Sequence, residues 1–271
     1  MMLDYQRLSA GTIIDQRYRI KKLVKAGGMG AVYQAEDQLM DMKLCAVKEM
    51  LDSFTDPADR RAAIDRFLSE VQVLGSLSHS NIPHVRDHFL ENNNFYFVME
   101  YIDGIDLATM LSQQGNPGLE EYKVIEWAIQ VCEALEYLHS LKPPIAHRDI
   151  KSSNLILRHS DGRILLIDFG IARVTNPSEG FWIGSAGYAP PEQQAGKPEP
   201  RSDLYALGAT IHELVTGRKP ESFNFPALKE LGVDSPKLDE LLKRALEWDP
   251  GRRISSATEM KESFRRFSDI K

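Results

Sequence analysis

The stretch His147-Arg148-Asp149-Ile150-Lys151-Ser152-Ser153-Asn154, followed by an apolar run and Asp168-Phe169-Gly170, organises the rest of the sequence. An aspartate can accept a proton from an attacking hydroxyl, and a lysine two residues later can neutralise a phosphoryl oxygen. An asparagine and a second aspartate can hold a hard divalent cation through oxygen. Together, these residue types at this spacing indicate phosphoryl-transfer chemistry, whereas each triplet alone is as well explained by chance.

Two short apolar runs, Leu155–Leu157 and Ile164–Ile167, flank the turn residues Ser160-Asp161-Gly162. Apolar runs on both sides of such a turn predict a β-hairpin. Because a hairpin brings the outer ends of its strands together, we expect Asn154 and Asp168 to lie side by side. Two ligands of one metal ion must be neighbours in this way.

Composition places the chain among ordinary globular proteins. Its 271 residues fit one large two-lobed unit or two small domains, with 42% hydrophobic and 27% charged residues. A net charge of −6 without a long basic run argues against nucleic acid or an anionic membrane as a partner. Cys45 and Cys132 lie far apart in apolar contexts, which predicts buried thiols in a reducing compartment.

No stretch approaches the roughly 18 apolar residues of a membrane span. The N-terminus shows no basic and then apolar leader, so no signal peptide is apparent. We therefore expect a cytoplasmic protein without a membrane segment in this chain, and an anchor outside the chain remains open.

The first hundred residues are rich in predicted strands. Tyr18–Val24 alternates loosely, Ala26–Gly30 is a glycine-rich turn, and Val32–Ala35 and Leu44–Lys48 continue as strand. Glycines let a backbone approach phosphates closely, although most glycine-rich turns are only tight turns. A dinucleotide-binding unit would have a helix after the glycines, and none is predicted there.

A single major helix is predicted after these strands. Asp56-Pro57 is typical of a helix start, and one apolar stripe follows at Ile64, Phe67, Leu68, Val71 and Leu74. Glu70 borders this stripe, and Lys48 ends the preceding strand. Each charge alone would be a solvated surface group, but the two together favour an ion pair.

Beyond residue 120 the periodicity is helical. Gly217 and Pro220 should end the second of three predicted helices. The apolar stripes of these helices are Val124, Trp127, Ala128, Val131, Leu135 and Leu138; Leu204, Leu207, Ile211, Leu214 and Val215; and Leu238, Leu241, Leu242, Ala245 and Leu246.

Several of these segments resemble motifs of the eukaryotic-like protein-kinase family. His147–Asn154 is similar to the catalytic loop, Asp168-Phe169-Gly170 to the metal-binding triplet, and Ala46-Val47-Lys48 to the strand-three lysine motif. Gly184–Glu192 resembles the end of the activation segment. The similarity covers Tyr18 to Phe267 and looks most like the bacterial Ser/Thr protein kinases of the eukaryotic type.

The resemblance implies an α+β, bilobal protein-kinase fold. A lead-in at residues 1–17 would precede a single kinase domain at 18–267. Its N-lobe, residues 18–101, would be a small antiparallel sheet with one major helix. Its C-lobe, residues 102–271, would be larger and mainly helical.

The resemblance also implies ATP-dependent transfer of a γ-phosphoryl group to Ser or Thr hydroxyls of proteins, including this chain itself. Asp149 would orient the hydroxyl and accept its proton, and Lys151 would stabilise the transferring group. Asn154 and Asp168 would bind Mg²⁺, or Mn²⁺ in its place. The catalytic residues that the resemblance assigns are Asp149, Lys151, Lys48, Glu70 and Ser185.

The resemblance places ATP against a set of residues drawn from both predicted lobes. Met99 would be the gatekeeper, backbone groups of Glu100 and Ile102 would bind adenine, and Asp106 would meet the ribose. The full set is Val24, Gly27, Gly28, Gly30, Val32, Ala46, Lys48, Met99, Glu100, Ile102, Asp106 and Ile156.

Further residues match bracing and regulatory positions of the family. Asp203 would brace the catalytic-loop backbone, and Arg253 would pair with Glu192. Phe169, His147 and Leu74 would stack between the lobes. Arg148 would bind an anion on an activation segment phosphorylated at Thr175 or Ser178, and we expect Trp182 to replace part of that anchoring.

Two departures keep alternatives open. Lys25 stands at the first glycine position of the glycine-rich motif, and Pro190 replaces an alanine, so a pseudokinase acting as a nucleotide-binding scaffold remains the main alternative. A small-molecule kinase would usually lack the Gly184–Glu192 segment. Ser185 and Lys151 favour Ser/Thr over Tyr acceptors. Dimerisation is allowed by the resemblance and is carried by no particular residue.

Overall fold

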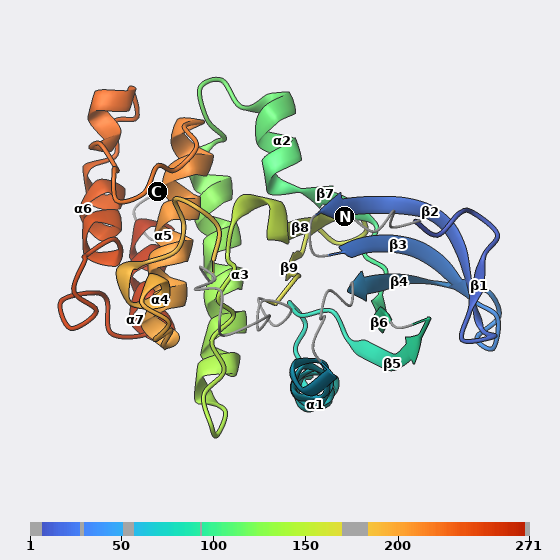
Figure 1. Cartoon of the computed structure of the whole chain (residues 1–271). Coiled ribbons are helices and arrows are strands. Elements are labelled where there is room, and N and C mark those ends of the chain that lie inside the picture. Colours follow the sequence, from blue (N-terminus) through green and yellow to red (C-terminus); the bar gives the residue numbers. More distant parts are fainter. Residues whose placement is uncertain (1–6, 28–29, 51–56, 93, 170–183, 269–271) are drawn as a thin grey trace, which may run out of the picture. The chain divides into compact units, whose positions relative to one another are not determined.

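The computed structural model describes residues 7–27, 30–50, 57–92, 94–169 and 184–268. These residues form two compact units. Within the described ranges, the first unit comprises residues up to 78 and residues 83–102. The second comprises residues 79–82 and the described residues after 102 (Figure 1).

The first unit is built on one antiparallel sheet with the strand order β1-β2-β3-β4-β6-β5. The predicted strands are confirmed, and residues 38–42 separate β3 from β4. The strands are β1 (Ile13–Ile14), β2 (Tyr18–Gly27), β3 (Gly30–Asp37), β4 (Lys43–Met50), β5 (Val85–Glu91) and β6 (Asn94–Glu100).

The segment expected to be a lead-in contributes to this sheet. Ile13 and Ile14 pair with Arg19 and Tyr18 of β2. The amide of Gly11 donates to Ile20 O, and the amide of Ile20 donates to Thr12 O, both at 2.8 Å. These bonds cover the outer edge of β2, which would otherwise be an open sheet edge.

One face of the sheet encloses an aromatic core. Tyr18 stacks on Phe89 with ring centroids 5.8 Å apart, and Phe89 stacks on Tyr96 at 5.1 Å. β3 alternates strictly between buried and half-buried residues, as expected for a strand with one face in a core. The period of two therefore decides which side chains of this unit are buried.

A carboxylate lies inside this core. Glu49 is 1% exposed, and it accepts hydrogen bonds from Tyr96 Oη at 2.6 Å, Asn94 Nδ2 at 2.9 Å and Tyr33 Oη at 3.0 Å. Leu8 N donates to Tyr33 Oη at 3.1 Å, so the first described residues close over the same hydroxyl. A buried charge requires such partners because water is excluded from it.

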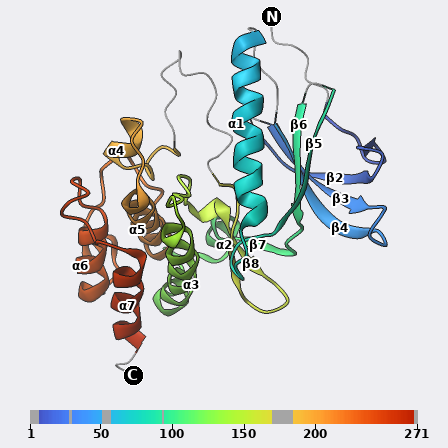
Figure 2. The same ribbon diagram turned by 90° about the horizontal axis from the view of Figure 1, so that it is seen from below.

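Helix α1 (Pro57–Ser76) lies along β5 and β6 in the same unit (Figure 2). Val71 and Leu74 are buried, and Val71 packs with Phe95 and Phe97 of β6. The prediction that Leu68 belongs to the buried stripe is wrong, because its side chain is 37% exposed. The predicted cap at Asp56 and the side chains of Phe67 and Glu70 lie outside the described part of the chain.

The second unit is mainly helical, which confirms the expected α+β class. The three predicted apolar stripes are buried, except that Leu246 is half-buried just beyond its helix. The elements are β7 (Gly104–Asp106), α2 (Leu107–Gln114), α3 (Glu121–Ser140), β8 (Leu155–Arg158), β9 (Ile164–Leu166), α4 (Pro191–Gln194), α5 (Pro200–Thr216), α6 (Pro236–Ala245) and α7 (Ala257–Ser268).

Helix α5 is the centre of this unit. Residues Ser202–Thr216 are all buried, and α3 and α6 both pack against the helix. A capping box between Glu199 and Ser202 begins α5. Gly217 ends it with a φ of 70°, a left-handed conformation that glycine adopts without strain, as the sequence predicts.

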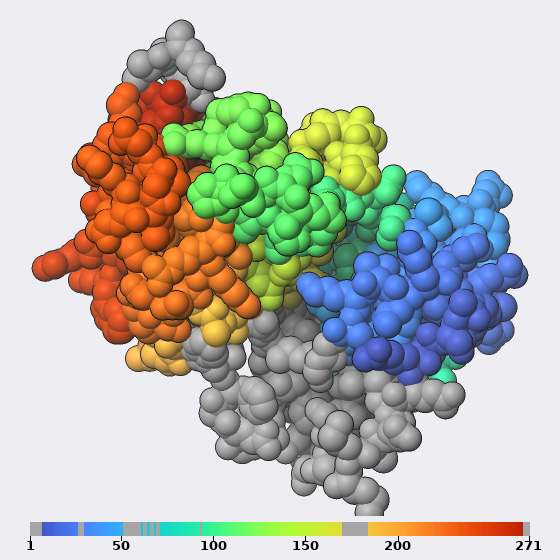
Figure 3. All heavy atoms as spheres, turned by 90° about the horizontal axis from the view of Figure 1, so that it is seen from above, coloured from blue at the N-terminus to red at the C-terminus, as the bar shows by residue number. Residues whose placement is uncertain are grey.

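The second unit also carries a surface groove of about 550 Å³ between α2, the start of α3 and the β8–β9 hairpin. Met110, Trp127 and Leu157 contribute apolar lining residues. In Figure 3, the green residues of α2 and α3 mark this face of the unit.

Among the described residues, no helix combines the length and hydropathy required to cross a bilayer. Cys45 and Cys132 are buried free thiols, as predicted.

Candidate active site

The predicted hairpin holds the two candidate metal ligands next to each other. β8 and β9 are antiparallel, with Leu155 opposite Leu166. Just beyond this pair, the amide of Ile167 donates to Asn154 O at 2.9 Å. Asp168 follows Ile167 directly, so the expectation that Asn154 and Asp168 lie at neighbouring strand ends is confirmed.

Asp149 is the centre of a dense hydrogen-bond network. Its Oδ1 accepts from Ser185 Oγ at 2.8 Å, and its Oδ2 accepts from Lys151 Nζ and Asn154 Nδ2, both at 3.0 Å. Lys151 Nζ also donates to Ser185 Oγ at 2.7 Å. Asp149 is 7% exposed, so one buried carboxylate is fixed by three side chains.

The environment of Asn154 fits a divalent cation. Asn154 is 1% exposed, and its Nδ2 also donates to Asp149 O at 2.8 Å. Its Oδ1 is buried and has no hydrogen-bond partner among the described residues. An orphaned amide oxygen beside an aspartate is a suitable donor for Mg²⁺, which prefers oxygen ligands. Asp168 itself has a φ of 57°, a left-handed conformation uncommon for residues other than glycine.

Asp203 of α5 holds the backbone of the loop that carries Asp149. Asp203, which is completely buried, accepts from the amide of His147 at 2.8 Å and from the amide of Arg148 at 2.9 Å. His139 Nε2 lies 2.9 Å from the same carboxylate. Arg148 has a φ of 70°, a strained conformation that these bonds stabilise. This is the bracing arrangement that the family resemblance implies for Asp203.

His147 packs against Phe169. Their ring centroids lie 4.6 Å apart, and His147 Nε2 lies 3.2 Å from Ile167 O. Burial lowers the pKa of His147, and the nearby Asp203 and Asp149 oppose this shift. The third residue of the expected stack, Leu74, belongs to the first unit, so the complete stack remains a prediction.

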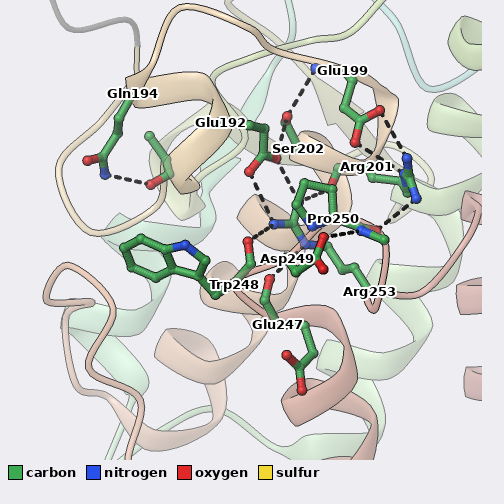
Figure 4. A network of polar contacts seen from close by, with 12 residues as sticks. Glu192, Gln194, Glu199, Arg201, Ser202, Glu247, Trp248, Asp249, Pro250 and Arg253 are labelled. Carbon is green, nitrogen blue, oxygen red and sulfur yellow. Dashed lines mark hydrogen bonds and ion pairs between the residues drawn. The ribbon is translucent and has the colours of Figure 1, made fainter.

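Glu192 and Arg253 form the predicted ion pair at the end of the activation segment (Figure 4). Arg253 Nη1 lies 2.7 Å from Glu192 Oε1, and the Arg253 side chain is fully buried. Ser202 Oγ donates to the same oxygen at 2.7 Å. Burial opposes ionisation of Glu192, but the hydrogen bonds from Arg253 and Ser202 outweigh it and lower the pKa of Glu192.

The sequence analysis did not single out Glu213. This residue of α5 is 7% exposed and accepts from Tyr188 Oη at 2.8 Å. Burial raises the pKa of Glu213 and also that of Tyr188. Its position between the stripe residues Ile211 and Leu214 was the available signal, since it places the carboxylate on a helix that is buried all round.

The candidate nucleotide-binding residues of the first unit lie on two hairpins and at one strand end. Gly27 pairs with Gly30 across the β2–β3 turn, and a Cβ at Gly30 would lie 1.9 Å from Glu49 O. Only glycine fits there. The amide of Glu100 donates to His84 O at 3.0 Å, so this amide already has a partner, and the adenine contact of Glu100 stays a prediction.

The remaining candidates of this unit differ in exposure. Val24 is 51% exposed, Val32 is half-buried, Ala46 and Ile102 are largely buried, and Met99 packs beside Phe97. Lys48 Nζ lies 5.4 Å from the Phe97 ring centroid. The predicted Lys48–Glu70 pair is not tested, because the Glu70 side chain lies outside the described part. Gly28 also lies outside it.

In the second unit, Asp106 has a structural partner. Its Oδ1 accepts from Thr109 N at 2.9 Å and its Oδ2 from Thr109 Oγ1 at 2.7 Å, so it is the N-cap of α2. The Asp-x-x-Thr spacing was a signal for this cap. Ile156 lies opposite Asp106 in the β7–β8 pair. A ribose contact of Asp106 stays a prediction.

Gly170, Thr175, Ser178 and Trp182 lie outside the described residues. The Nε of Arg148 is buried and has no hydrogen-bond partner among the residues that are described.

Comparison with known proteins identifies similar chains that are protein kinases. Residues 18–264 match the Protein kinase domain family. The chain is 38% identical to the serine/threonine-protein kinase PknA of Nostoc sp., over 93% of this chain and 47% of that protein. It is 33% identical to serine/threonine-protein kinase B of Synechocystis sp., over 91% of this chain and 46% of that protein.

A solved structure supports the same fold. The crystal structure of the Mycobacterium tuberculosis PknI kinase domain superposes with a TM-score of 0.78 at 28% identity, covering 96% of this chain and 99% of that one. The chain spans about half the length of the curated relatives it matches. Given the match over residues 18–264 and the network around Asp149, the chain belongs to the protein kinase domain family.

Proposed function

We propose that this chain transfers the γ-phosphoryl group of ATP to Ser or Thr hydroxyls of proteins, including other copies of itself. The observation that carries the proposal is the network of Asp149, Lys151, Ser185 and Asn154 in one buried cluster. A hydroxyl nucleophile needs a fixed proton acceptor, and the transferring group needs a nearby positive charge. The cluster supplies both.

Asp149 would accept the proton of the attacking hydroxyl as its oxygen bonds to the γ-phosphorus. The bond from the γ-phosphorus to the β–γ bridging oxygen breaks, and ADP leaves. Lys151 would neutralise the negative charge on the transferring group. Because Ser185 and Asn154 both donate to Asp149, the carboxylate is held in one orientation and little reorganisation is needed during the reaction.

Asn154 and Asp168 would hold Mg²⁺, or Mn²⁺ in its place. The bound cation would supply neutralisation of phosphate charge. The orphaned Oδ1 of Asn154 supports this assignment from the protein side. In the first unit, Lys48 paired with Glu70 would position the α and β phosphates.

Intact-mass spectrometry after incubation with Mg²⁺ and ATP tests the proposal. Transfer adds about 80 Da per phosphoryl group, a value that follows from the chemistry of the modification. We expect such steps for the wild type and none for Asp149→Asn, in which the amide no longer accepts a proton. Asp161→Asn, a change in the exposed β8–β9 turn, is the matched control and should behave as the wild type.

ATP affinity should be measured on the same samples by calorimetry. Asp149→Asn is expected to bind ATP like the wild type. Equal phosphorylation of the wild type and Asp149→Asn would refute the catalytic role. ATP binding by the wild type without transfer to itself or to an added protein would favour a nucleotide-binding scaffold.

A further inference from the structure

Two large aromatic side chains stand together on the surface of the second unit. Trp248 is 60% exposed and Phe223 is 38% exposed, and their ring centroids lie 4.5 Å apart at an angle of 54°. We call Phe223 and Trp248 the aromatic pair. A side chain of this size that is left in water costs free energy, so an exposed pair in contact suggests a binding surface.

The loop before α6 holds Phe223 outward in a strained conformation. Phe223 has a φ of 60°, an outlier for a bulky residue. The turn around it is fixed by Asn224, whose amide donates to Glu221 O at 3.1 Å and whose Nδ2 donates to Glu221 Oε2 at 3.0 Å. Phe225, two residues after Phe223, anchors the turn, with its ring centroid 6.0 Å from that of Tyr205 and 5.4 Å from that of His212. The strain is therefore held by contacts on both sides.

Trp248 is equally fixed by its backbone. Arg253, the buried partner of Glu192, donates to Glu247 O at 3.1 Å and to Trp248 O at 3.4 Å. In Figure 4 the Trp248 ring points away from the Glu192–Arg253 ion pair. The backbone under both members of the aromatic pair is thus held in place before any partner arrives, which reduces the entropy lost on binding.

The loop that carries Phe223 adjoins the segment that contains Ser185. A Cβ built at Gly187 would lie 2.3 Å from Pro220 O, so the two backbones touch. Ser185, two residues from Gly187, bonds Asp149. A line of contacts therefore runs from the proposed reaction centre, through Gly187 and Pro220, to the loop that carries Phe223.

The charges that flank Trp248 in the chain favour a positively charged partner. Glu247 and Asp249 are its two neighbours, and both are exposed. The Glu247 side chain has no ion-pair partner among the described residues. Arg218, at the start of the loop that carries Phe223, is paired with Glu221 at 3.3 Å. An indole face attracts a cation, and nearby carboxylates strengthen that attraction.

We propose that the aromatic pair and Glu247 form a docking surface for acceptor proteins that present a basic side chain next to an apolar one. The inference rests on the proposed kinase activity for the identity of the partner. The basic group lies over Trp248 and toward Glu247, and the apolar group packs on Phe223. Binding to this docking surface keeps an acceptor protein near Asp149. It does not involve those residues of the acceptor that flank the hydroxyl to be phosphorylated.

Direct binding tests this surface without requiring turnover. The probe is fluorescently labelled histone H1, a basic protein chosen for its chemistry, titrated with the whole chain without ATP at fixed ionic strength. We expect Trp248→Ala to raise the Kd about tenfold, the effect of an aromatic anchor. Because this change leaves the net charge unaltered, non-specific attraction to a chain of net charge −6 stays constant.

Two further variants and a control sharpen the test. Phe223→Gly removes the ring and suits the left-handed backbone, so it should weaken binding while the chain stays folded. Glu247→Gln should weaken binding with a smaller dependence on salt. Tyr122→Ala removes another exposed aromatic residue, 55% exposed at the start of α3, and should leave the Kd unchanged.

The proposal is overturned if histone H1 does not bind, if Trp248→Ala binds within twofold of the wild type, or if Tyr122→Ala weakens binding equally. A kinetic comparison distinguishes an effect of Trp248→Ala on docking from an effect on phosphoryl transfer. In Trp248→Ala the ratio of kcat/KM for histone H1 to that for a short serine peptide should fall about tenfold. If the wild type transfers no phosphoryl group to any acceptor, the proposed function is contradicted, whereas the measured binding of histone H1 remains valid.

Discussion

The hydroxyl of Ser185 donates a hydrogen bond of 2.8 Å to Oδ1 of Asp149. Ser185 Oγ in turn accepts a hydrogen bond from Lys151 Nζ at 2.7 Å, so the hydroxyl joins the proposed base to the proposed charge stabiliser. Ser185 follows a glycine with a φ of 135°, in a segment far from Asp149 in the sequence. The position of this segment therefore affects the reaction centre directly.

Replacing Ser185 should separate a hydroxyl effect from a shape effect. Ser185→Ala removes the hydroxyl that bonds both Asp149 and Lys151, which keep their direct contact. We expect kcat to fall about 10- to 100-fold, as the loss of a hydrogen bond to a charged group of roughly 1.5–3 kcal/mol implies. Ser185→Thr keeps the hydroxyl and should retain most of the activity. Steady-state kinetics with a peptide acceptor measures both, and equal losses in the two variants would contradict the bridging role.

Asn154 should set the Mg²⁺ requirement. Asn154→Ala removes the orphaned oxygen, and we expect the Mg²⁺ concentration for half-maximal activity to rise about tenfold or more, because ligand losses weaken metal sites at least that much. Asn154→Asp restores an oxygen and should recover part of the affinity. The rise in Tm caused by Mg²⁺ with ATP gives a second readout, and an unchanged Mg²⁺ dependence in Asn154→Ala would exclude this residue as a ligand.

The Glu192–Arg253 pair should shape the acid limb of the stability profile. Because its pKa is lowered below 4.5 in the folded chain, Glu192 stabilises the fold above that pH and loses its contribution as the pH falls through the folded-state value. Glu192→Gln should cost about 2 kcal/mol of unfolding free energy at neutral pH and flatten the acid limb.

Urea denaturation at a series of pH values checks this behaviour. Glu133→Gln removes an exposed carboxylate whose partner Arg265 is also exposed, so its profile should follow the wild type. Parallel acid limbs for the wild type and Glu192→Gln would contradict the assignment.

The activation segment can be tested although its middle lies outside the described residues. The buried Arg148 Nε has no partner among the described residues, which suits an anion such as a phosphate. If Trp182 replaces part of that anchoring, Thr175→Ala with Ser178→Ala should retain substantial activity and Trp182→Ala should lose more. The hypothesis fails if the double variant is inactive while Trp182→Ala is fully active, as measured by phosphate incorporation.

Local patterns predicted the parts of the fold that depend on nearby residues. The β8–β9 hairpin, the end of α5 at Gly217 and the buried helix stripes follow from turn residues and periodicity. The contacts of Asp203 and of Arg253 with Glu192 followed from family motifs, because spacing alone does not bring such distant residues together.

Other features depend on contacts that a local pattern does not specify. Leu68 fits the helical stripe, but its exposure is decided by where the sheet lies against α1. Glu49 follows Lys48 and looks like a second surface charge. Successive side chains of a strand point to opposite faces, so Glu49 lies on the same face as Val47, in the core, and Lys48 lies on the other face. A stricter use of this period of two would have predicted the burial of Glu49. Phe223 gave no such signal, because its backbone conformation is held by Glu221, Asn224 and Phe225.

The bonds of the first described residues to β2 and Tyr33 bear on how a shortened version of this protein would behave. The family match begins at residue 18, which invites trimming at that point. Such a chain would lose the strand that pairs with β2 and the amide that bonds Tyr33 Oη. A bare strand edge recruits other strands, so we expect the trimmed protein to self-associate and precipitate during purification, with its catalytic residues intact.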